Sequence, residues 1–166
     1  MSEERIEKLE KSLQHLRKRV DQLDRRQTDV SDGLRYAVLA CAVAGAILAM
    51  TAATWRTVGG ADGYVETLWG MVPEGWQAAW TLGGVLVVGV GTIAVFVADT
   101  AGKASHIVFV VLALLTAVGI VLVGAVDAGG YYSAEEGDSA PARWLTLLAT
   151  LFLAVVHGTR ANDIRR

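Results

Sequence analysis

Hydrophobic and polar positions divide this chain into two unlike regions. Residues 1–33 are mostly charged or polar, whereas from Leu34 onward charge is confined to short connectors and the tail. A soluble domain mixes apolar and charged residues at the period of a helix or a strand. Here the apolar residues form blocks close to the roughly 20 helical residues that cross a bilayer. The pattern therefore predicts an integral membrane protein with a polar N-terminal segment.

Four apolar blocks are candidates for membrane-spanning helices, at 36–55, 78–98, 107–126 and 144–158. The second is entered through Pro73 and Glu74, which suit the first turn of a helix. Ser105 is the expected N-cap of the third. The fourth is the shortest and spans only about 22 Å at the rise of an α-helix. We expect Arg143 to lengthen it by reaching outward to the headgroups.

The predicted fold class is an all-α membrane protein, in which an N-terminal cytoplasmic coiled-coil helix precedes a four-helix transmembrane bundle. Its expected parts are a coiled-coil segment at 1–33, a four-span domain at 34–158 and a cytoplasmic tail at 159–166. With four spans, all but two of the 15 Lys and Arg residues fall on one side, and the exceptions are Arg56 and Arg143. Because cytoplasmic loops are enriched in Lys and Arg, both termini are expected in the cytoplasm, at a prokaryotic plasma membrane.

Aromatic residues cluster at the opposite, outer boundary, where indole and phenol rings favour the headgroup zone. They are Trp55, Tyr64, Trp69, Trp76, Trp80, Tyr131, Tyr132 and Trp144. The apolar spacing within 64–72 predicts a short amphipathic helix lying in the outer interface. The loop at 128–142 is acidic and rich in glycine, which indicates a solvated turn or, less simply, a weak contact with a cation or partner.

A heptad repeat occupies the N-terminal segment. Its a and d positions are Ile6, Leu9, Leu13, Leu16, Val20, Leu23, Gln27 and Val30. Such a narrow seam with charged flanks favours a coiled coil. The alternatives are a single amphipathic helix packed elsewhere in the protein and a basic helix on the inner leaflet. We expect a parallel homo-oligomer, most simply a dimer, with a heteromeric coil as the rival.

Small residues recur every fourth position along the first span. They are Ala37, Cys41, Gly45, Ala49 and Ala53. In lipid, small residues let helix backbones approach closely, so this stripe is predicted to be a helix-packing face. Cys41 is the only cysteine, which excludes an intrachain disulfide, and it is interpreted as a small structural residue.

Chemistry-bearing residues are sparse. The four spans contain no Asp, Glu, Lys or Arg, although carriers coupled to protons or ions usually keep such groups there. Their mid-span polar residues are Thr92, Thr116 and Thr150, expected to bond within or between helices. Asp99, His106 and His157 lie near the inner boundary and resemble a metal-binding set only loosely, so they are interpreted as solvated residues.

A segment at 98–105 is only superficially like a P-loop, because it lacks the first glycine and has Ala after the Lys. We therefore expect no enzyme activity, no catalytic residue, no cofactor, no bound metal and no nucleic-acid partner. The expected partners are the lipid bilayer and either a second copy or a coiled-coil protein. The expected function is that of a tetraspan scaffold or accessory subunit of a membrane assembly. The alternative is a small oligomeric channel or transporter, and a lipid-modifying enzyme is a distant third.

Overall fold

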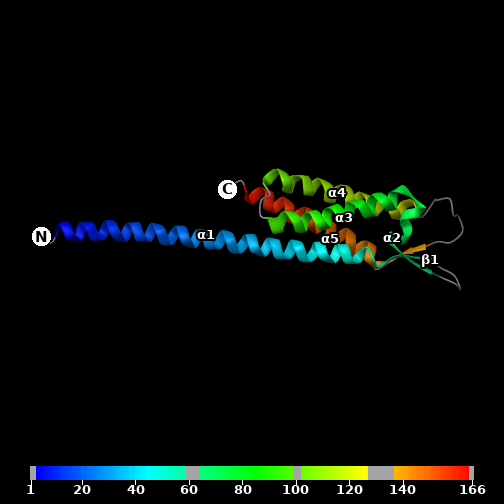
Figure 1. Ribbon diagram of the computed structural model, residues 1–166, viewed down its shortest axis with the longest axis horizontal. Helices are drawn as coiled ribbons and strands as arrows, with labels where there is room; N and C mark the ends of the chain where they lie inside the picture. Colours follow the sequence, from blue (N-terminus) through cyan, green and yellow to red (C-terminus); the bar gives the residue numbers. More distant parts are fainter. Residues whose placement is uncertain (1–2, 59–63, 99–101, 127–136, 165–166) are drawn as a thin grey trace. The chain divides into compact units, whose positions relative to one another are not determined.

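The computed structural model describes residues 3–58, 64–98, 102–126 and 137–164. Within these ranges the chain is mostly helical (Figure 1). The elements in chain order are α1 (Glu3–Met50), β1 (Thr54–Val58), β2 (Tyr64–Thr67), α2 (Leu68–Met71), the 3-10 turn η1 (Val72–Glu74), α3 (Trp76–Ala98), α4 (Lys103–Val126), β3 (Gly137–Ser139) and α5 (Pro141–Asp163). Two compact units are present, Met1–Tyr36 and Ala37–Arg166, and each is described by itself.

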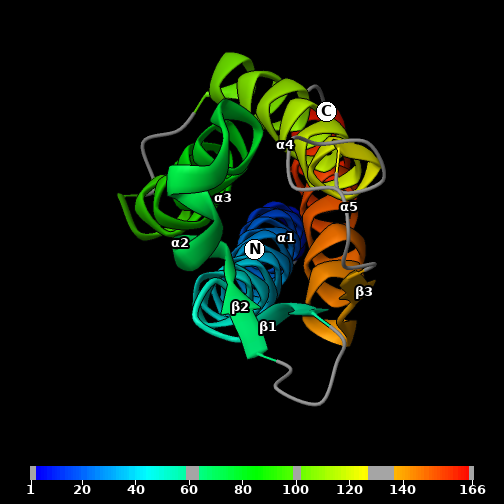
Figure 2. The same ribbon diagram turned by 90° about the vertical axis from the view of Figure 1, so that its right-hand side faces the viewer.

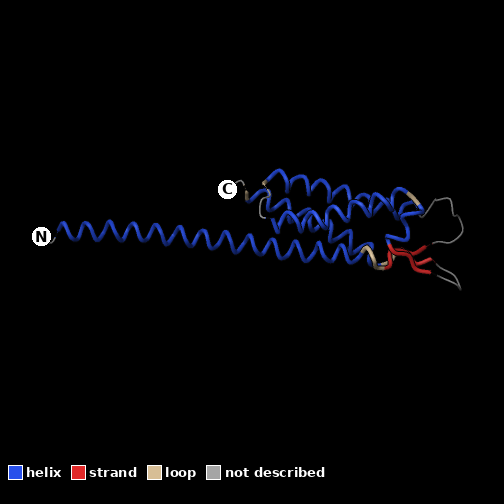
Figure 3. The backbone as a smooth tube through the Cα atoms, in the orientation of Figure 1, coloured by secondary structure: helices blue, strands red, loops and turns tan. Residues whose placement is uncertain are grey.

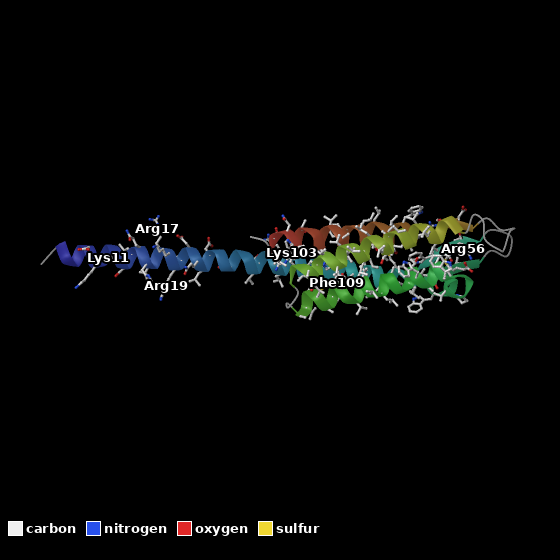
Figure 4. The ribbon with its side chains drawn as sticks, turned by 90° about the horizontal axis from the view of Figure 1, so that it is seen from above. Lys11, Arg17, Arg19, Arg56, Lys103 and Phe109 are labelled. Carbon is white, nitrogen blue, oxygen red and sulfur yellow. The ribbon has the colours of Figure 1, made fainter. Side chains whose placement is uncertain are left out.

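The N-terminal unit consists of the first part of α1. Figure 4 labels three of its basic residues, Lys11, Arg17 and Arg19. Lys11 pairs with Glu7 one turn earlier, with 2.7 Å between Nζ and Oε1. Such an exposed pair adds only a few tenths of a kcal/mol, roughly 0.3–0.5 for an i,i+4 pair. Helix formation over this segment agrees with the heptad spacing, whereas the coiled coil itself stays a prediction.

The second unit contains four helices that are long and apolar enough to span a membrane. They are Gly33–Met50, which begins just before this unit, Trp76–Ala98, Lys103–Val123 and Pro141–Asp163. This confirms the predicted number of apolar helices. Figure 2 looks down the bundle and shows α4 beside α3 and α5. The end of α1 meets α3 where Leu48 faces Gly89, and meets α5 where the Thr146 hydroxyl lies 3.5 Å from the Met50 sulfur.

The core between these helices is built from small and β-branched residues. The buried apolar positions include Ala40, Ala44, Ile47, Val85, Val88, Ala113, Ile120, Leu153 and Ala154. Large apolar side chains lie instead on the outside of the same helices, where Val111, Leu148 and Val155 are 50–63% exposed. An apolar exterior around a tightly packed interior is the arrangement expected of helices that face lipid, since lipid tails are as apolar as leucine.

The first span ends earlier than predicted, at Met50 rather than at residue 55. Thr51 closes a tight turn by donating its hydroxyl to the Leu48 carbonyl at 2.7 Å. Trp55 then folds back, is only 1% exposed, and donates its indole N–H to the Met50 carbonyl at 2.7 Å. The prediction that Trp55 lies in an interfacial belt is therefore wrong. Trp69, Trp76, Trp80 and Trp144 are all about half exposed or more, as a belt requires.

A small antiparallel sheet at one end of the bundle was not predicted (Figure 3). Its strand order is β2-β1-β3, and Arg56 on β1 pairs with Glu66 on β2 as an ion pair. The amphipathic helix predicted over 64–72 is thus wrong for its first half, which is strand. Thr67 ends this strand and caps α2 by accepting from the Gly70 amide at 3.2 Å. Of the acidic loop, 128–136 lies outside the described residues and 137–139 forms β3.

Two helix starts also differ from expectation. Helix α4 begins at Lys103, so Ser105 lies inside its first turn and is not an N-cap. Helix α5 runs from Pro141 to Asp163, a 23-residue element in place of the predicted 144–158. Pro141 occupies the first turn, where its missing N–H costs nothing. The fourth span therefore has the length to cross a bilayer unaided, at about 34 Å for that many residues.

Arg143 does not reach outward as predicted but is buried in the first turn of α5, with 6% of its surface exposed. Its guanidinium donates to the Ile120 and Val121 carbonyls of α4, at 3.2 and 3.3 Å. It also donates to the Ser139 hydroxyl at 2.5 Å and lies 5.1 Å from the centre of the Trp144 ring. Because a guanidinium offers five donors in a fixed plane, one side chain ties α4, β3 and α5 together.

Candidate functional site

Two histidines meet inside the bundle. His106 lies in the second turn of α4 and His157 lies in α5, six residues before its end. Their Nδ1 atoms are 2.9 Å apart, and the side chains are buried, with residue exposures of 3% and 0%. Buried polar groups are normally hydrogen-bonded, and this contact has the distance of a hydrogen bond between the two rings.

Thr92 of α3 completes a polar chain of three side chains. Its hydroxyl lies 3.0 Å from Nε2 of His157, and it is fully buried. Three helices therefore contribute one group each, and His157 stands in the middle with both ring nitrogens engaged. Hereafter Thr92, His106 and His157 are called the histidine cluster.

Aromatic rings enclose the histidine cluster. Phe109 stacks on His157, with centroids 5.1 Å apart and planes inclined by 17°. Phe96 contacts both histidines with centroids 5.4 Å away, edge-on to His106. Gly91 makes room for this arrangement, since a Cβ there would come within 2.5 Å of the Phe109 ring. The cluster is consequently held in an apolar shell in which each polar contact is strong and each lost contact is costly.

Figure 4 places the histidine cluster along the bundle. Phe109, which stacks on His157, lies toward the end of the bundle marked by Lys103, and Arg56 marks the other end. In sequence, Lys103 precedes His106 by three residues, and Arg160 follows His157 by three. Positive charges therefore lie one helical turn from each histidine, toward the end with few aromatic residues.

The sequence interpretation of His106 and His157 as solvated boundary residues is wrong, although their convergence was considered. Both lie inside helices, because α4 begins at Lys103, before the predicted 107, and α5 continues to Asp163, beyond the predicted 158. Asp99, the third member of the set considered, lies outside the described residues. Among the described residues, no group of three His, Cys, Asp or Glu side chains could hold a metal ion. His106 and His157 instead form a hydrogen-bonded pair.

The other mid-span threonines do not join this chain. Thr116 donates to the Leu112 carbonyl of its own helix at 2.8 Å, and Thr150 donates to the Thr146 carbonyl at 2.7 Å. Both hydroxyls therefore form hydrogen bonds within their own helix, as is common in membrane helices. Buried apolar residues stand between them and the histidine cluster along α3 and α5, namely Val88, Leu153 and Ala154.

The predicted seam on α1 forms an exposed apolar stripe. The residues whose side chains are described are Leu13, Leu16, Val20, Leu23 and Val30, at 57–72% exposure. Gln27 at the remaining described position is also exposed. Ile6 and Leu9 belong to the same helix. Five large apolar side chains on one helix face are a larger patch than isolated surface residues produce, and such patches mark interaction sites.

The small-residue stripe of the first span does not coincide with the face that is buried within the chain. Ala40, Ala44 and Ile47 are fully buried, whereas Gly45 and Ala49 are exposed. Of the other predicted members, Ala37, Cys41 and Ala53 are partly buried. A Cβ added at Gly45 would meet nothing within 4 Å. Any close packing at Gly45 must therefore come from outside this chain.

Comparison with known proteins finds no match for this chain: no protein-family model, no curated protein and no solved structure resembles it.

Proposed function

We propose that this chain is a tetraspan membrane protein that self-associates through the N-terminal part of α1 and serves as a scaffold or accessory subunit of a membrane assembly. Its four apolar helices, each 18 residues or longer, support insertion into a bilayer. The asymmetric distribution of Lys and Arg favours cytoplasmic termini. The observation that carries the proposal is the exposed apolar stripe on α1.

A second copy of the same helix fits this stripe best. In a parallel pair, each g residue faces the following e residue of its partner. This sets Arg5 against Glu10 and Arg19 against Asp24, which are attractive pairs, while Ser12 faces Arg17 neutrally. An antiparallel pair brings g near g, and three of the four g positions are arginine. Chains inserted with a single topology also present these segments in the same direction.

A dimer is the favoured assembly. Ile6 and Val20 at a positions, with Leu at every d position but the last, favour two strands, whereas Leu13 at a does not discriminate. The polar Gln27 at a fixes register at a cost in stability. With only about three and a half heptads, the isolated segment is marginal in water. Tethering to a membrane raises its effective concentration and thereby favours association.

The deciding experiment is chemical crosslinking of the full-length protein in membranes, followed by mass analysis of stoichiometry in mild detergent. Leu16→Asp places a charge in the seam, and Gln14→Asp places the same charge on the outer face as a matched control. We expect Leu16→Asp to abolish the crosslinked dimer and Gln14→Asp to keep it. Equal crosslinking of both variants refutes the homomeric coil, and a dissimilar protein crosslinked through the seam supports the heteromeric rival.

An oligomeric channel or transporter is the second candidate. It would need a hydrated path, and Thr92, Thr116 and Thr150 are the mid-span polar residues able to line one. In the described part of the chain these hydroxyls are buried and bonded to neighbouring groups. The scaffold is therefore ranked first, and any path would have to form between copies.

A further inference from the structure

We propose that the His106–His157 pair is a proton-binding site that acts as a clasp between α4 and α5. The clasp is closed while one proton is shared between the two Nδ1 atoms, and it opens when both nitrogens are protonated. This inference goes beyond the scaffold role and does not depend on it. It rests on the 2.9 Å Nδ1–Nδ1 contact and on the burial of both rings.

The contact requires an unequal pair of nitrogens. A neutral imidazole has one N–H donor and one acceptor nitrogen, so one Nδ1 donates and the other accepts. Thr92 matches either arrangement, because its hydroxyl can donate to Nε2 of His157 in one tautomer and accept from it in the other. One added proton can leave this bond in place, because the ring that stays neutral can keep an acceptor at Nδ1. A second added proton makes both rings imidazolium, which leaves two N–H groups facing each other at a distance suited to one hydrogen.

The surroundings make that second proton act on the helices. Both rings lie in a shell that includes Phe96 and Phe109, where solvent cannot replace the lost hydrogen bond. Two adjacent imidazolium charges repel strongly in a medium of low polarity. The repulsion between the rings is reduced most directly if the start of α4 and the end of α5 move apart at that end of the bundle.

The nearest charged residues along α4 and α5 are both positive. From α5, the charge of Arg160 acts on His106, and Lys103 stands one turn before His106 on α4. Within the described residues, α3 presents Thr92 and Phe96 to the pair, and α4 presents Phe109. These neighbours supply no carboxylate to neutralise a doubly protonated pair. On the proposed topology this end faces the cytoplasm, so the protons that open the clasp come from that side.

Clasp opening is measured as a distance. Ala104 on α4 and Asn162 on α5 are exposed, so Ala104→Cys and Asn162→Cys in a Cys41→Ala background carry a pair of spin labels. We expect the label-to-label distance in the full-length protein to lengthen between about pH 8 and pH 4, because the apolar shell and the charge of the first imidazolium oppose the second proton. A helix shift of about 1–2 Å or more is the expected scale.

Two variants decide the cause. His106→Gln keeps a neutral hydrogen-bonding side chain that does not titrate, and it should abolish the lengthening. His15→Gln, which removes the histidine of the N-terminal unit, should keep it. An unchanged distance in the parent protein, or the same lengthening in His106→Gln, overturns the clasp.

If the His106→Gln variant fails to fold, a measurement on the unsubstituted protein still tests the clasp. With ¹⁵N-labelled histidine, we expect a scalar coupling between two Nδ1 atoms across one hydrogen at about pH 8, lost at about pH 4. A spectrum with no such coupling at the higher pH refutes the shared proton. A coupling that persists at the lower pH refutes the opening.

Discussion

Glycine decides how closely α3 and α4 approach each other. A Cβ at Gly84 would lie 2.5 Å from the Thr116 hydroxyl oxygen, and one at Gly119 would lie 2.9 Å from that of Thr81. Such distances are too short for any real contact, so the two helices pack through these missing side chains. In lipid, where apolarity gives no advantage to helix association, close backbone approach supplies much of the attraction.

A matched pair of glycine substitutions tests this reading. Gly84→Ala forces Thr116 aside and should lower the free energy of unfolding by about 1–3 kcal/mol, the usual cost of overpacking. Gly45→Ala meets open space and gains helix propensity of up to about 1 kcal/mol, so its stability should be unchanged or higher. The measurement is the thermal midpoint of each variant in detergent. Equal midpoints would mean that α3 and α4 are not packed at Gly84.

The residues that the sequence placed wrongly are those whose environment depends on distant elements. His106 and His157 are 51 positions apart, so their contact follows from helix register and not from local spacing. Arg143 was expected to seek water, and the α4 carbonyls that it meets instead are more than 20 positions away. An arginine and two histidines in or directly beside the apolar blocks did mark both sites. No local pattern in the sequence identified the residues that contact Arg143, His106 and His157.

At the scale of elements, the apolar blocks predicted the existence of the helices better than their ends. The block at 78–98 matches α3 closely, because apolar residues fill the helix almost to both ends. Helix α5 extends well past the predicted 144–158, because Arg160, Asn162 and Asp163 continue it with polar residues. Hydropathy indicates which part of a helix is apolar, whereas the helix itself continues for as long as its backbone hydrogen bonds do.

The three-stranded sheet illustrates the same limit. Strand β1, Thr54–Val58, is rich in β-branched and aromatic residues that favour strands, yet it directly follows an apolar block. Its outer partner β3, Gly137–Ser139, is only three residues long and pairs across about 80 positions of sequence. So short a strand carries no detectable alternation of its own.

The exposed part of the small-residue stripe on α1 leads to an element-scale prediction. Because Gly45 is exposed and has open space around it, Gly45→Leu should leave the thermal midpoint of a single chain nearly unchanged. If the stripe packs against a second copy, the same change should weaken self-association in a bilayer, because a large side chain separates the backbones. Energy transfer between labelled chains in liposomes measures this, with Val43→Leu as the control. Unchanged transfer in Gly45→Leu would remove the stripe from the interface.

At the scale of the whole molecule, two independent patterns agree on orientation. Basic residues concentrate at the N-terminal segment, the connector before α4 and the C-terminal tail. Trp69, Trp76, Trp80 and Trp144 are exposed around the opposite end of the bundle. Cations seek the cytoplasmic face, and indoles concentrate at the headgroup level. Arg56 and Arg143 are the basic exceptions at that end. The ion pair with Glu66 offsets the charge of Arg56, and Arg143 is buried against the Ile120 and Val121 carbonyls.

Topology is therefore the prediction that tests the whole arrangement. Lys18→Cys lies on the outer face of the predicted coil, and Asp138→Cys lies on β3, and both positions are exposed. In a Cys41→Ala background, each variant carries a single thiol, because Cys41 is the only native cysteine. With an impermeant thiol reagent on intact cells, we expect Asp138→Cys to react and Lys18→Cys to react only after the cells are opened. Positive charge retained on the cytoplasmic side sets the orientation of the helices. The opposite labelling pattern would therefore show that the orientation is the reverse of the predicted one, with the seam and the histidine cluster's end of the bundle outside. Labelling of both positions in intact cells would instead mean an even number of crossings between them, and would remove from the membrane one of the three apolar helices that lie between Lys18 and Asp138.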